Sequence, residues 1–430
     1  QKRRQIIMAQ SANINMNNPI IRVLLVHSSP NLTIVPATLW KAKKLDGSAI
    51  ADLPALAEAK IFFSNGKILL ECSGGKFTLD SFALEATEPC GIMEIKKVPF
   101  GVGWWWEGTQ DRTYEGRIEI FPNAKGNLDV VNVLTMEEYL RGVVPSEIGP
   151  TSPQEALRAQ AVAARSEALL ALMTGKYAGT HHDTGSDVES QAFTGTTKRT
   201  AGSDESVLAT RGLALIFEGK PIPAYYASSC GGHTEDIRNV WHERVGEKSY
   251  WDTAVYDGEK TFDYDLSKEE YLRRWLEADP NVFCNPNKYN VPDWASKNFR
   301  WEREITADDL SKRIASSKKD IGRVIAIKPI KRGSSGRLIE VEFVGETGSL
   351  IAGPELEIRQ VFDPPLKSAA FVVDTQGPQS RPDKFIIRGA GWGHGVGMCQ
   401  TGAIAMAHSG KNFREILAHY YPTSRVESVY

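Results

Sequence analysis

One glutamate occupies a position suited to acid–base chemistry. Glu147 occurs in the stretch YLRGVVPSEIGP, between a short amphipathic segment and a strong helix start. A carboxyl group packed against apolar side chains can have a raised pKa and act as a general acid, and Val143, Val144 and Ile148 could form that apolar wall. Alternatively, Glu147 could serve only as an acidic partner for the N-terminal dipole of the next helix.

A glycine-rich segment offers a different kind of chemistry. GWGHGVGMCQTGA, residues 391–403, surrounds Trp392 and His394 with glycines. Glycine lets backbone groups approach a ligand closely, while an indole can cover the face of a ring and an imidazole can donate a hydrogen bond. We therefore expect Trp392, His394 and Gln400 to contact a ligand. The same glycines could also form a tight turn from a strand into a helix that begins at Gln400.

A turn of small residues forms a third candidate region. In AYYASSCGGHTE, residues 224–235, a β-prone aromatic run leads into two serines and, after a cysteine, two glycines. Backbone N–H groups in such a turn can face a ligand, as they do in anion-binding nests. The residues expected to bind a ligand here are Tyr226, Ser228, Ser229 and Gly231, although paired glycines also occur in ordinary turns.

A long helix should follow Glu147. The stretch from Ser152 to Gly175 has the helix period, with Ser152 as the expected N-cap, Pro153 at the first helical position and Gly175 as the stop. Its inward face is rich in alanine, and Gln160 and Arg165 interrupt that face. We expect both to bind substrate; the alternatives are solvated positions and, for Arg165, a buried structural role.

A shorter helix should precede Glu147. The sequence predicts it over residues 135–141, with an end at Gly142. Two valines should then be buried, Pro145 should fix a turn, and Glu147 should lie in the loop between the two helices.

The first part of the chain, residues 21–135, should be rich in β-strands. Asn65-Gly66 between two β-prone runs is a strong hairpin signal, GRIEIFPNAKGNLDVVNVLT predicts another hairpin, and IRVLLV and LTIVPA flank a turn. Trp104, Trp105 and Trp106 precede the second hairpin, where they could plug the end of a sheet or stack on sugar rings.

Composition excludes several classes of protein. The formal net charge is -2, so no global field would recruit nucleic acid, and 41% hydrophobic residues is too many for a disordered chain. No apolar run approaches the length of a membrane span, and the start QKRRQIIMAQ lacks the apolar run of a signal peptide. We expect a globular protein that binds no nucleic acid, has no membrane span and carries no targeting segment.

Five blocks occur in an order that resembles the SpoIID/LytB domain family. They are YLRGVVPSE (139–147), RAQAVAARSEAL (158–169), DVESQAFTG (187–195), AYYASSCGGHTE (224–235) and GWGHGVGMCQTGAIAMA (391–407). The resemblance extends from the first predicted strand to the C-terminal HYYP. It implies a SpoIID-like α+β fold, with a β-rich, mostly antiparallel core, a central alanine-rich helix and a C-terminal helix.

The resemblance also implies an activity. The sporulation member of that family is a peptidoglycan lytic transglycosylase, and LytB is an amidase enhancer. By resemblance, Glu147 is the catalytic glutamate, and Gln191 in the third block binds substrate. Glu147 would protonate the glycosidic oxygen between MurNAc and GlcNAc and then accept the proton of the muramyl 6-hydroxyl, which closes a 1,6-anhydro ring. The implied substrate is glycan strands stripped of stem peptides, and the implied location is extracytoplasmic: periplasm, cell wall or secreted.

Two other functions stay open. The protein could bind glycan strands without cutting them and assist a cell-wall amidase, or it could be a hydrolase in which Glu147 works with Asp187 or Glu235 and a water molecule. Glu302 and Glu304 are further carboxylates that could take a catalytic role, although most such groups form surface ion pairs.

We expect no metal ion or other cofactor. Zinc-binding relatives use cysteine and histidine near the third block, where this chain has no cysteine, and the adjacent histidines before that block rarely share one ion. The alternative is a zinc site formed by Cys230, His233, His394 and Cys399, whose spacings permit chelation. The two cysteines could instead form a disulfide or stay free.

The expected domain organisation follows the blocks. It comprises an N-terminal tail (1–20), a β-rich part (21–135), a SpoIID-like catalytic core (136–241 and 376–430) and an elaborated α/β segment within that same domain (242–375). The last of these contains a helical stretch in DLSKEEYLRRWLEA and a hairpin around GSSGRLIEVEFVGETGSL.

Overall fold

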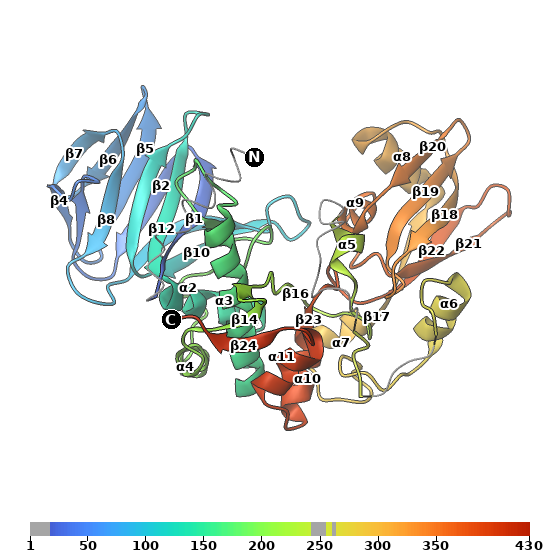
Figure 1. The fold of residues 1–430 in the computed structure, drawn as a ribbon. Helices are drawn as coiled ribbons and strands as arrows, with labels where there is room; N and C mark the ends of the chain where they lie inside the picture. Colours follow the sequence, from blue (N-terminus) through green and yellow to red (C-terminus); the bar gives the residue numbers. More distant parts are fainter. Residues whose placement is uncertain (1–17, 242–254, 260–263) are drawn as a thin grey trace. The chain divides into compact units, whose positions relative to one another are not determined.

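The computed structural model describes residues 18–241, 255–259 and 264–430 (Figure 1). The chain folds into two compact units. Unit 1 consists of the chain up to Leu215 together with Pro221–Pro223 and Val426–Tyr430, and unit 2 consists of Ile216–Lys220 and Ala224–Arg425. Most of the expected tail, residues 1–17, lies outside the described residues. The elaborated segment lies in unit 2, and the predicted catalytic core contributes residues to both units.

A seven-stranded sheet forms one half of the β-structure in unit 1. Its strands, in spatial order, are β13 (Thr184–Gly185), β1 (Ile20–Ser29), β12 (Leu128–Thr135), β11 (Arg117–Pro122), β8 (Phe82–Ala86), β3 (Trp40–Lys43) and β4 (Ala49–Leu53). All neighbours are antiparallel except β1 and β13. The sheet therefore joins the N-terminal strands to the short strand that opens the 184–195 region.

A six-stranded antiparallel sheet forms the other half. Its order is β10 (Gly108–Tyr114), β9 (Met93–Phe100), β2 (Asn31–Pro36), β5 (Ala59–Ser64), β6 (Lys67–Cys72) and β7 (Gly75–Leu79). Leu32 and Ile34 alternate with more exposed residues along β2, as Ile68 and Leu70 do along β6. This period of two gives the sheet one apolar face. Contacts between β11 and β6, and between β1 and β9, pack the two sheets together.

Both hairpins predicted in unit 1 are confirmed. Asn65 and Gly66 both have positive φ and connect β5 to β6, as predicted from their types. The hairpin of β11 and β12 is also confirmed. The runs IRVLLV and LTIVPA form strands β1 and β2, but these do not pair with each other: β1 lies in the seven-stranded sheet and β2 in the six-stranded one. Ser28, with φ +58, redirects the chain from one sheet to the other.

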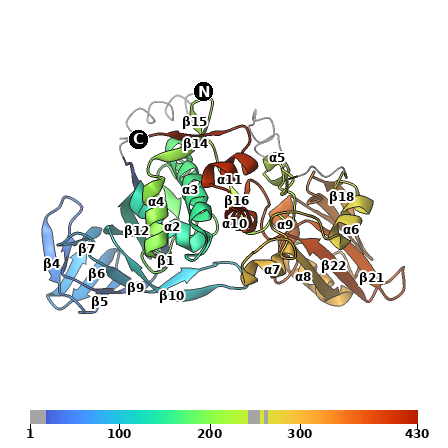
Figure 2. The ribbon, with the colours of Figure 1, turned by 90° about the horizontal axis from the view of Figure 1, so that it is seen from below.

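Unit 1 also contains three helices among its described residues. They are α2 (Met136–Glu147), α3 (Gln154–Thr174) and α4 (Ala201–Ala209), and each contacts the other two. Figures 1 and 2 both show the three helices side by side, with α2 directly after β12. The alanines of α3 are almost all buried, which allows the close approach expected from their size. The prediction of a central alanine-rich helix is confirmed.

Helix α2 is longer than the sequence predicts. It does not stop at Gly142 but continues through Pro145 to Glu147. Gly142 serves packing instead, since a Cβ there would lie 2.4 Å from the Phe193 ring. Ser146 Oγ donates to the Gly142 carbonyl at 2.6 Å, and burial of the apolar residues on both sides of Gly142 favours continuation. Glu147 therefore ends a helix rather than lying in a loop.

The long helix has the predicted end but a different start. Gly175 adopts the left-handed conformation, with φ +60, and ends α3 as expected. At the other end Pro153 is the N-cap and no side chain caps the helix. Ser152 Oγ donates to the carbonyl of Ile148 at 2.7 Å, so this hydroxyl ties α3 to the end of α2.

Unit 2 contains short sheets and seven helices among its described residues. The sheets are β16 (Tyr226–Ala227) with β23 (Met398–Cys399), β17 (Arg300–Thr306) with β22 (Lys384–Ala390) and β21 (Phe371–Gln376), and β18 (Val324–Arg332) with β19 (Leu338–Gly345) and β20 (Ser349–Ala352). The helices are α5 (Ile237–Val240), α6 (Glu269–Glu277), α7 (Asp293–Phe299), α8 (Ala307–Ser317), α9 (Glu355–Gln360), α10 (Gln400–His408) and α11 (Phe413–Tyr420). The chain passes between the units within β14 (Leu213–Phe217), β15 (Lys220–Pro221) and β24 (Arg425–Ser428), and at residues 223–224.

The core of unit 2 confirms two predicted elements. Helix α6 occupies the predicted helical stretch, and β19 and β20 form the predicted hairpin. Buried residues of α8, α9 and the strands around them, including Phe343, Phe362 and Phe371, form one apolar cluster. The overall fold class is α+β with mostly antiparallel sheets, as predicted. Among the residues that the structure describes, no helix combines the length and the apolarity needed to cross a membrane.

Candidate functional site

Glu147 is half-buried at the C-terminal end of α2. Its Oε1 accepts a hydrogen bond of 2.6 Å from the backbone N–H of Ala192. Val143 and Val144 precede it by one helical turn and are fully buried, and Ile148 is 1% exposed. The carboxyl group is therefore held between the end of a helix and the backbone of the 187–195 segment, next to the three residues suggested as its apolar wall.

Gln191 ties the 187–195 segment to both long helices. Its Oε1 accepts a hydrogen bond of 2.9 Å from the Tyr139 hydroxyl on α2, and its Nε2 donates to the carbonyl of Ala164 on α3 at 3.2 Å. The side chain is only 3% exposed, and the Phe193 ring packs against Tyr139 with centroids 5.3 Å apart. In this conformation Gln191 positions the backbone that binds Glu147.

Two ionisable groups near Glu147, which are Glu167 and Lys198, did not stand out in the sequence. Burial raises the pKa of Tyr139, and the negative charges of Glu147 and Glu167 raise it further. Partial desolvation lowers the pKa of Lys198, the positive charge of Arg112 lowers it further, and the charge of Glu147 acts in the opposite direction. Glu167 and Lys198 are therefore within electrostatic reach of the same region.

The spacing of the polar residues on α3 could have indicated Glu167 from the sequence. Gln160, Ala164 and Glu167 follow the i, i+4, i+7 spacing and share one face of α3. Gln160 is fully buried, so it is not a solvated position. A polar residue at each end of an otherwise small-residue stripe indicates that this face meets polar groups, and Gln191 is one of them.

Arg165 forms a buried ion pair in unit 1. Its guanidinium donates to both oxygens of Glu137, at 2.9 and 2.7 Å, and to the carbonyl of Leu213 at 3.0 Å. Arg165 is 0% exposed and Glu137 is 6% exposed. Glu137 also accepts hydrogen bonds from the Gly212 N–H and the Tyr430 hydroxyl. This arrangement favours the structural role for Arg165 among the alternatives that the sequence left open.

The tryptophan triplet lies in the loop between β9 and β10, and Val102 of this loop contacts the same segment as Glu147 does. Trp104 and Trp106 stack with centroids 4.8 Å apart, and Trp105 meets Trp106 edge to face. Trp105 is 45% exposed, so the cluster does not plug a sheet. The N–H of Val102 donates to Asp187 Oδ2 at 3.1 Å, which docks this loop on the start of the 187–195 segment.

In unit 2 the turn of small residues and the glycine-rich segment pair with each other. β16 and β23 are parallel neighbours, and Ser229 and Trp392 exchange two backbone hydrogen bonds of 3.1 and 2.8 Å. The carbonyl of Ser228 accepts from both the N–H and the hydroxyl of Thr401. The structure therefore brings together the unit 2 residues that the sequence singled out, which are Tyr226, Ser228, Ser229, Gly231, Trp392, His394 and Gln400.

The glycines of the 391–397 segment serve a compact turn. All four have positive φ, between +72 and +99. A Cβ on Gly397 would lie 2.0 Å from the Tyr225 carbonyl oxygen, and one on Gly395 would lie 2.2 Å from the guanidinium carbon of Arg337. Helix α10 begins at Gln400 directly after β23. The alternative of a strand-to-helix turn is thus confirmed.

His394 is held by backbone groups in that turn. Its Nδ1 accepts a hydrogen bond of 3.0 Å from the Val396 N–H, and the backbone of Tyr226 also hydrogen-bonds the ring. Burial lowers the pKa of His394 to about 3, and the positive charges of Arg337 and Arg359 lower it further. The imidazole is therefore neutral near pH 7, with its proton on Nε2.

The side chains of the remaining candidates differ in exposure. Ser229 is fully buried and Gln400 is 4% exposed, whereas Tyr226, Ser228 and Trp392 are half-buried. The Lys367 ammonium lies 5.8 Å from the centre of the Trp392 ring. Of this group, the half-buried side chains are the ones that a ligand can reach in the present conformation.

The proposed set of zinc ligands with two cysteines and two histidines is not assembled. Cys230 and Cys399 do lie together, with the Cys230 N–H donating to Cys399 Sγ at 3.2 Å. The groups that join them are Cys284 and Asp257, not the two histidines. His233 Nδ1 contacts its neighbouring carbonyl, and His394 binds backbone as described, because the turns around them direct both rings elsewhere. No disulfide links any of the five cysteines.

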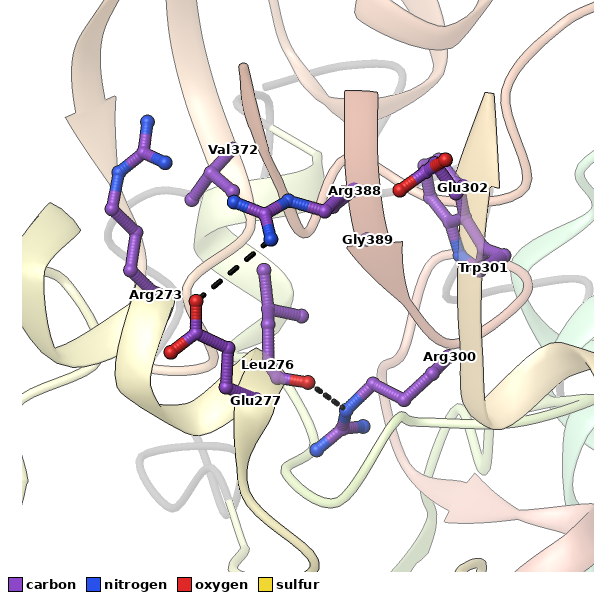
Figure 3. Close-up of a pocket in the computed structure, with 9 residues that line it drawn as sticks. All are labelled: Arg273, Leu276, Glu277, Arg300, Trp301, Glu302, Val372, Arg388 and Gly389. Carbon is purple, nitrogen blue, oxygen red and sulfur yellow. Dashed lines mark hydrogen bonds and ion pairs between the residues drawn. The ribbon is translucent and has the colours of Figure 1, made fainter. Parts of the chain in front are cut away.

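A separate pocket of about 310 Å³ in unit 2 contains other carboxylates (Figure 3). Glu277 faces Arg388 there at 3.8 Å, and Arg300 donates to the Leu276 carbonyl at 3.2 Å. Glu302 lines this pocket, while Glu304 pairs with Lys384 at 2.7 Å. The pocket adjoins the glycine-rich segment, because Trp301 Nε1, in its wall, donates to the Gly391 carbonyl at 2.9 Å.

The two carboxylates considered as partners of Glu147 in hydrolysis have local roles. Asp187 accepts the Val102 N–H in unit 1. Glu235, 3% exposed in unit 2, accepts hydrogen bonds from Ser334, Ser335, Asp236 and Asn239. These hydrogen bonds hold the Glu235 carboxyl group in place as a buried structural group.

Family models match two stretches of the chain. One described as Stage II sporulation protein matches residues 124–217, and one described as a domain of unknown function (DUF8618) matches residues 235–397. Similar proteins include the amidase enhancer of Bacillus subtilis, with 28% identity over 67% of this chain and 40% of that protein. The stage II sporulation protein D of Bacillus amyloliquefaciens shares 27% identity over 73% of this chain and 80% of that protein. The chain belongs to the SpoIID/LytB family.

A further relative of this SpoIID/LytB protein is an uncharacterised protein of Brachyspira hyodysenteriae, 29% identical over 72% of this chain and 70% of that protein. The Stage II sporulation match contains Glu147, Gln160, Arg165 and Gln191, and the second match contains Trp392 and His394. Because the chain covers 40% of the amidase enhancer, most of that relative has no counterpart in the comparison. Membership of the SpoIID/LytB family associates the chain with cell-wall processing.

Proposed function

We propose that this SpoIID/LytB protein cleaves peptidoglycan glycan strands between MurNAc and GlcNAc as a lytic transglycosylase, leaving 1,6-anhydro-MurNAc ends. The observation that carries the proposal is the placement of Glu147: half-buried, beside buried valines, and bound by a backbone N–H. A general acid needs such fixed geometry and an apolar surrounding. The site of action is outside the cytoplasm, where glycan strands are found.

The reaction needs one carboxyl group. Protonated Glu147 donates its proton to the glycosidic oxygen, and the bond between that oxygen and the anomeric carbon of MurNAc breaks. The resulting carboxylate takes the proton of the muramyl 6-hydroxyl, whose oxygen bonds to the anomeric carbon. Glu147 ends in its initial state, and no water is consumed. General acid–base assistance of this kind contributes about 10²–10⁴-fold.

The neighbours of Glu147 fit supporting roles in this scheme. The Ala192 N–H fixes one carboxyl oxygen, and Gln191 holds that backbone by its bonds to Tyr139 and α3. The exposed Trp105, on a loop docked to the same segment, offers a flat apolar face to a sugar ring. The substrate class that matches these features is a glycan strand stripped of stem peptides.

A second function is supported by the similarity to an amidase enhancer. In that case the protein binds glycan strands, does not cut them, and acts with a cell-wall amidase. The same aromatic loop would serve binding, and Glu147 would hold the 187–195 segment against the end of α2. The two functions predict different reaction products but use the same glycan-binding surface.

The experiment compares the products formed from purified glycan strands and from intact sacculi. The native protein, Glu147→Gln, Glu167→Gln and the control Glu189→Gln are incubated with both, and the products are examined by mass spectrometry. Glu189 is exposed in the same segment as Ala192, so its replacement tests for nonspecific effects. Transglycosylation predicts anhydro products from the native protein and the control, and their loss in Glu147→Gln.

Other outcomes identify the alternatives. Reducing-end products that disappear in Glu167→Gln indicate a hydrolase that uses two carboxylates. No products from any of the proteins, with all of them still sedimenting with the strands, contradict the enzymatic proposal and support the amidase-enhancer function. Circular dichroism of each variant verifies that α2 and its neighbours are folded.

A further inference from the structure

Three cysteines and one aspartate meet in the interior of unit 2. Cys230, Cys284, Cys399 and Asp257 each direct one possible ligand atom into the group, and these four atoms all lie within 4.8 Å of one another. All four residues are at most 2% exposed. They come from four separate stretches of chain, so the fold assembles the group and no local sequence motif produces it.

The dimensions of the group match those of one tetrahedral zinc ion. Zinc binds thiolate sulfur at about 2.3 Å, which places two sulfurs of a tetrahedron about 3.8 Å apart. The sulfurs of Cys230 and Cys284 are 3.7 Å apart. A span of 4.8 Å leaves room for a single ion between the ligands, but not for the several metal atoms of an iron–sulfur cluster.

Backbone and side-chain donors surround the ligand atoms as an outer shell. The N–H of Gly232 points to Cys230 Sγ at 3.3 Å, and the N–H of Gly402 points to Cys399 Sγ at 3.4 Å. Asp257 accepts from the Tyr420 hydroxyl at 2.6 Å and from the Cys284 N–H at 3.0 Å. Hydrogen bonds of this kind orient the ligand atoms and stabilise their negative charge.

A disulfide explains less of this arrangement than a metal ion does. A disulfide would join two of the three sulfurs and leave the third thiol beside a completely buried carboxylate. A metal ion instead gives all three sulfurs and the carboxyl group one shared partner. His419 lies 3.9 Å from Asp257, and Arg300 interacts electrostatically with Cys230 and Cys284. The positive charge of Arg300 offsets part of the excess negative charge of a site in which three thiolates and one carboxylate bind one divalent ion.

We propose that Cys230, Cys284, Cys399 and Asp257 bind one zinc ion in a closed structural site. Four protein ligands complete a tetrahedron, and their burial excludes substrate and water, which is the arrangement of structural zinc. The ion cross-links the turn at 228–232 and the start of α10 to the stretches around Asp257 and Cys284. It thereby fixes the pairing of the glycine-rich segment with Ser229. The site is independent of whether the protein cuts glycan strands.

The test measures metal content and coordination in the full chain. The zinc content of protein purified without chelators is measured by inductively coupled plasma mass spectrometry. The variants Cys284→Ser and Asp257→Asn and the control Cys90→Ser are measured in the same way. Cys90 is exposed in unit 1 and lies outside the cluster. The expected result is about one zinc per chain in the native protein and the control, and a clear loss in the two cluster variants.

A spectroscopic measurement covers the case in which the cluster variants fail to fold. Zinc is removed from the native protein by a chelator and replaced by Co²⁺, whose visible and near-ultraviolet bands report tetrahedral coordination and thiolate ligation. Strong thiolate bands in the native protein and in Cys90→Ser support the site. Native protein that contains no stoichiometric metal and gives no thiolate–cobalt bands overturns it, as does a disulfide within the cluster found by peptide mass mapping.

Discussion

Replacing Arg165 tests whether its role is structural. Arg165→Met removes two hydrogen bonds to Glu137 and those to two carbonyl oxygens, and it keeps a long apolar side chain. The carboxylate of Glu137 then stays buried and keeps the Gly212 N–H and the Tyr430 hydroxyl as donors. Breaking a buried ion pair on one side costs about 3–5 kcal/mol. We expect a loss of that size in the free energy of unfolding.

The double variant separates the pair from other effects. Replacing Glu137 by Gln in the Arg165→Met background removes the uncompensated charge, so the double variant should be more stable than the sum of the two single losses predicts, by up to about 3 kcal/mol. The control is Arg158→Met on the same helix. Arg158 forms half-exposed pairs with Glu155 and Glu205, and its loss should cost less than about 1 kcal/mol.

The assay is urea unfolding followed by circular dichroism, with glycan binding measured separately by sedimentation. A structural role predicts a lower unfolding midpoint for Arg165→Met and unchanged binding under conditions in which the variant is folded. Unchanged stability together with weakened binding would refute the reasoning, because it would show that Arg165 serves the ligand and not the Glu137 pair.

Three further predictions concern single residues. Because the folded-state pKa of His394 is lowered from 6.5 to about 3, the unfolded chain binds a proton that the folded chain does not as pH falls below 6.5. This histidine should therefore lower the free energy of unfolding by about 1.4 kcal/mol between pH 7.5 and 5.5. Urea unfolding of His394→Asn should lack that loss. The same pH dependence in the native protein and in His394→Asn would contradict this prediction. Trp105→Ala should weaken glycan sedimentation about threefold to tenfold, whereas Trp294→Ala, equally exposed in unit 2, should not; equal effects contradict an aromatic subsite. Gly395→Ala combines a positive φ with a clash against Arg337 and should lower the free energy of unfolding by about 2–5 kcal/mol. Gly410→Ala has a positive φ but open space around it, and should lower the free energy of unfolding by about 1–2 kcal/mol. Equal midpoints of thermal unfolding for the two variants would contradict the packing argument.

Local chemistry made part of the fold predictable. Asn65-Gly66 specifies a hairpin because few residue pairs accept two positive φ angles, and Gly175 stops α3 for the same reason. The periods of two and 3.6 located the sheets of unit 1 and the long helix. The family blocks directed attention to Glu147 and to the turn that pairs with the glycine-rich segment, both of which depend on short stretches of sequence.

Features that depend on tertiary contacts were not predictable. Helix α2 passes through Gly142 and Pro145 because the neighbouring residues are buried and Phe193 occupies the space next to Gly142. Local rules for glycine and proline do not predict that packing. The capping prediction for Ser152 failed in a similar way, since its hydroxyl binds the carbonyl of Ile148 instead.

The candidate metal ligands show the same limit. Cys230 and Cys399 could be paired from the family blocks, but Cys284 and Asp257 lie in a segment with no ligand spacing. Only the fold brings these four groups within 4.8 Å of one another. The histidines, which have plausible spacing to the two cysteines, are directed elsewhere by the turns that contain them.

The origin of the oxygen at the newly formed sugar end tests the central proposal most directly. Glycan strands are digested by the native protein in water labelled with heavy oxygen, and the released fragments are weighed by mass spectrometry. A reaction in which Glu147 transfers the proton and the 6-hydroxyl attacks predicts ends that are one water lighter than hydrolysis products and carry no label. Fragments with labelled reducing ends would contradict the account, because water and not the muramyl hydroxyl would then be the nucleophile.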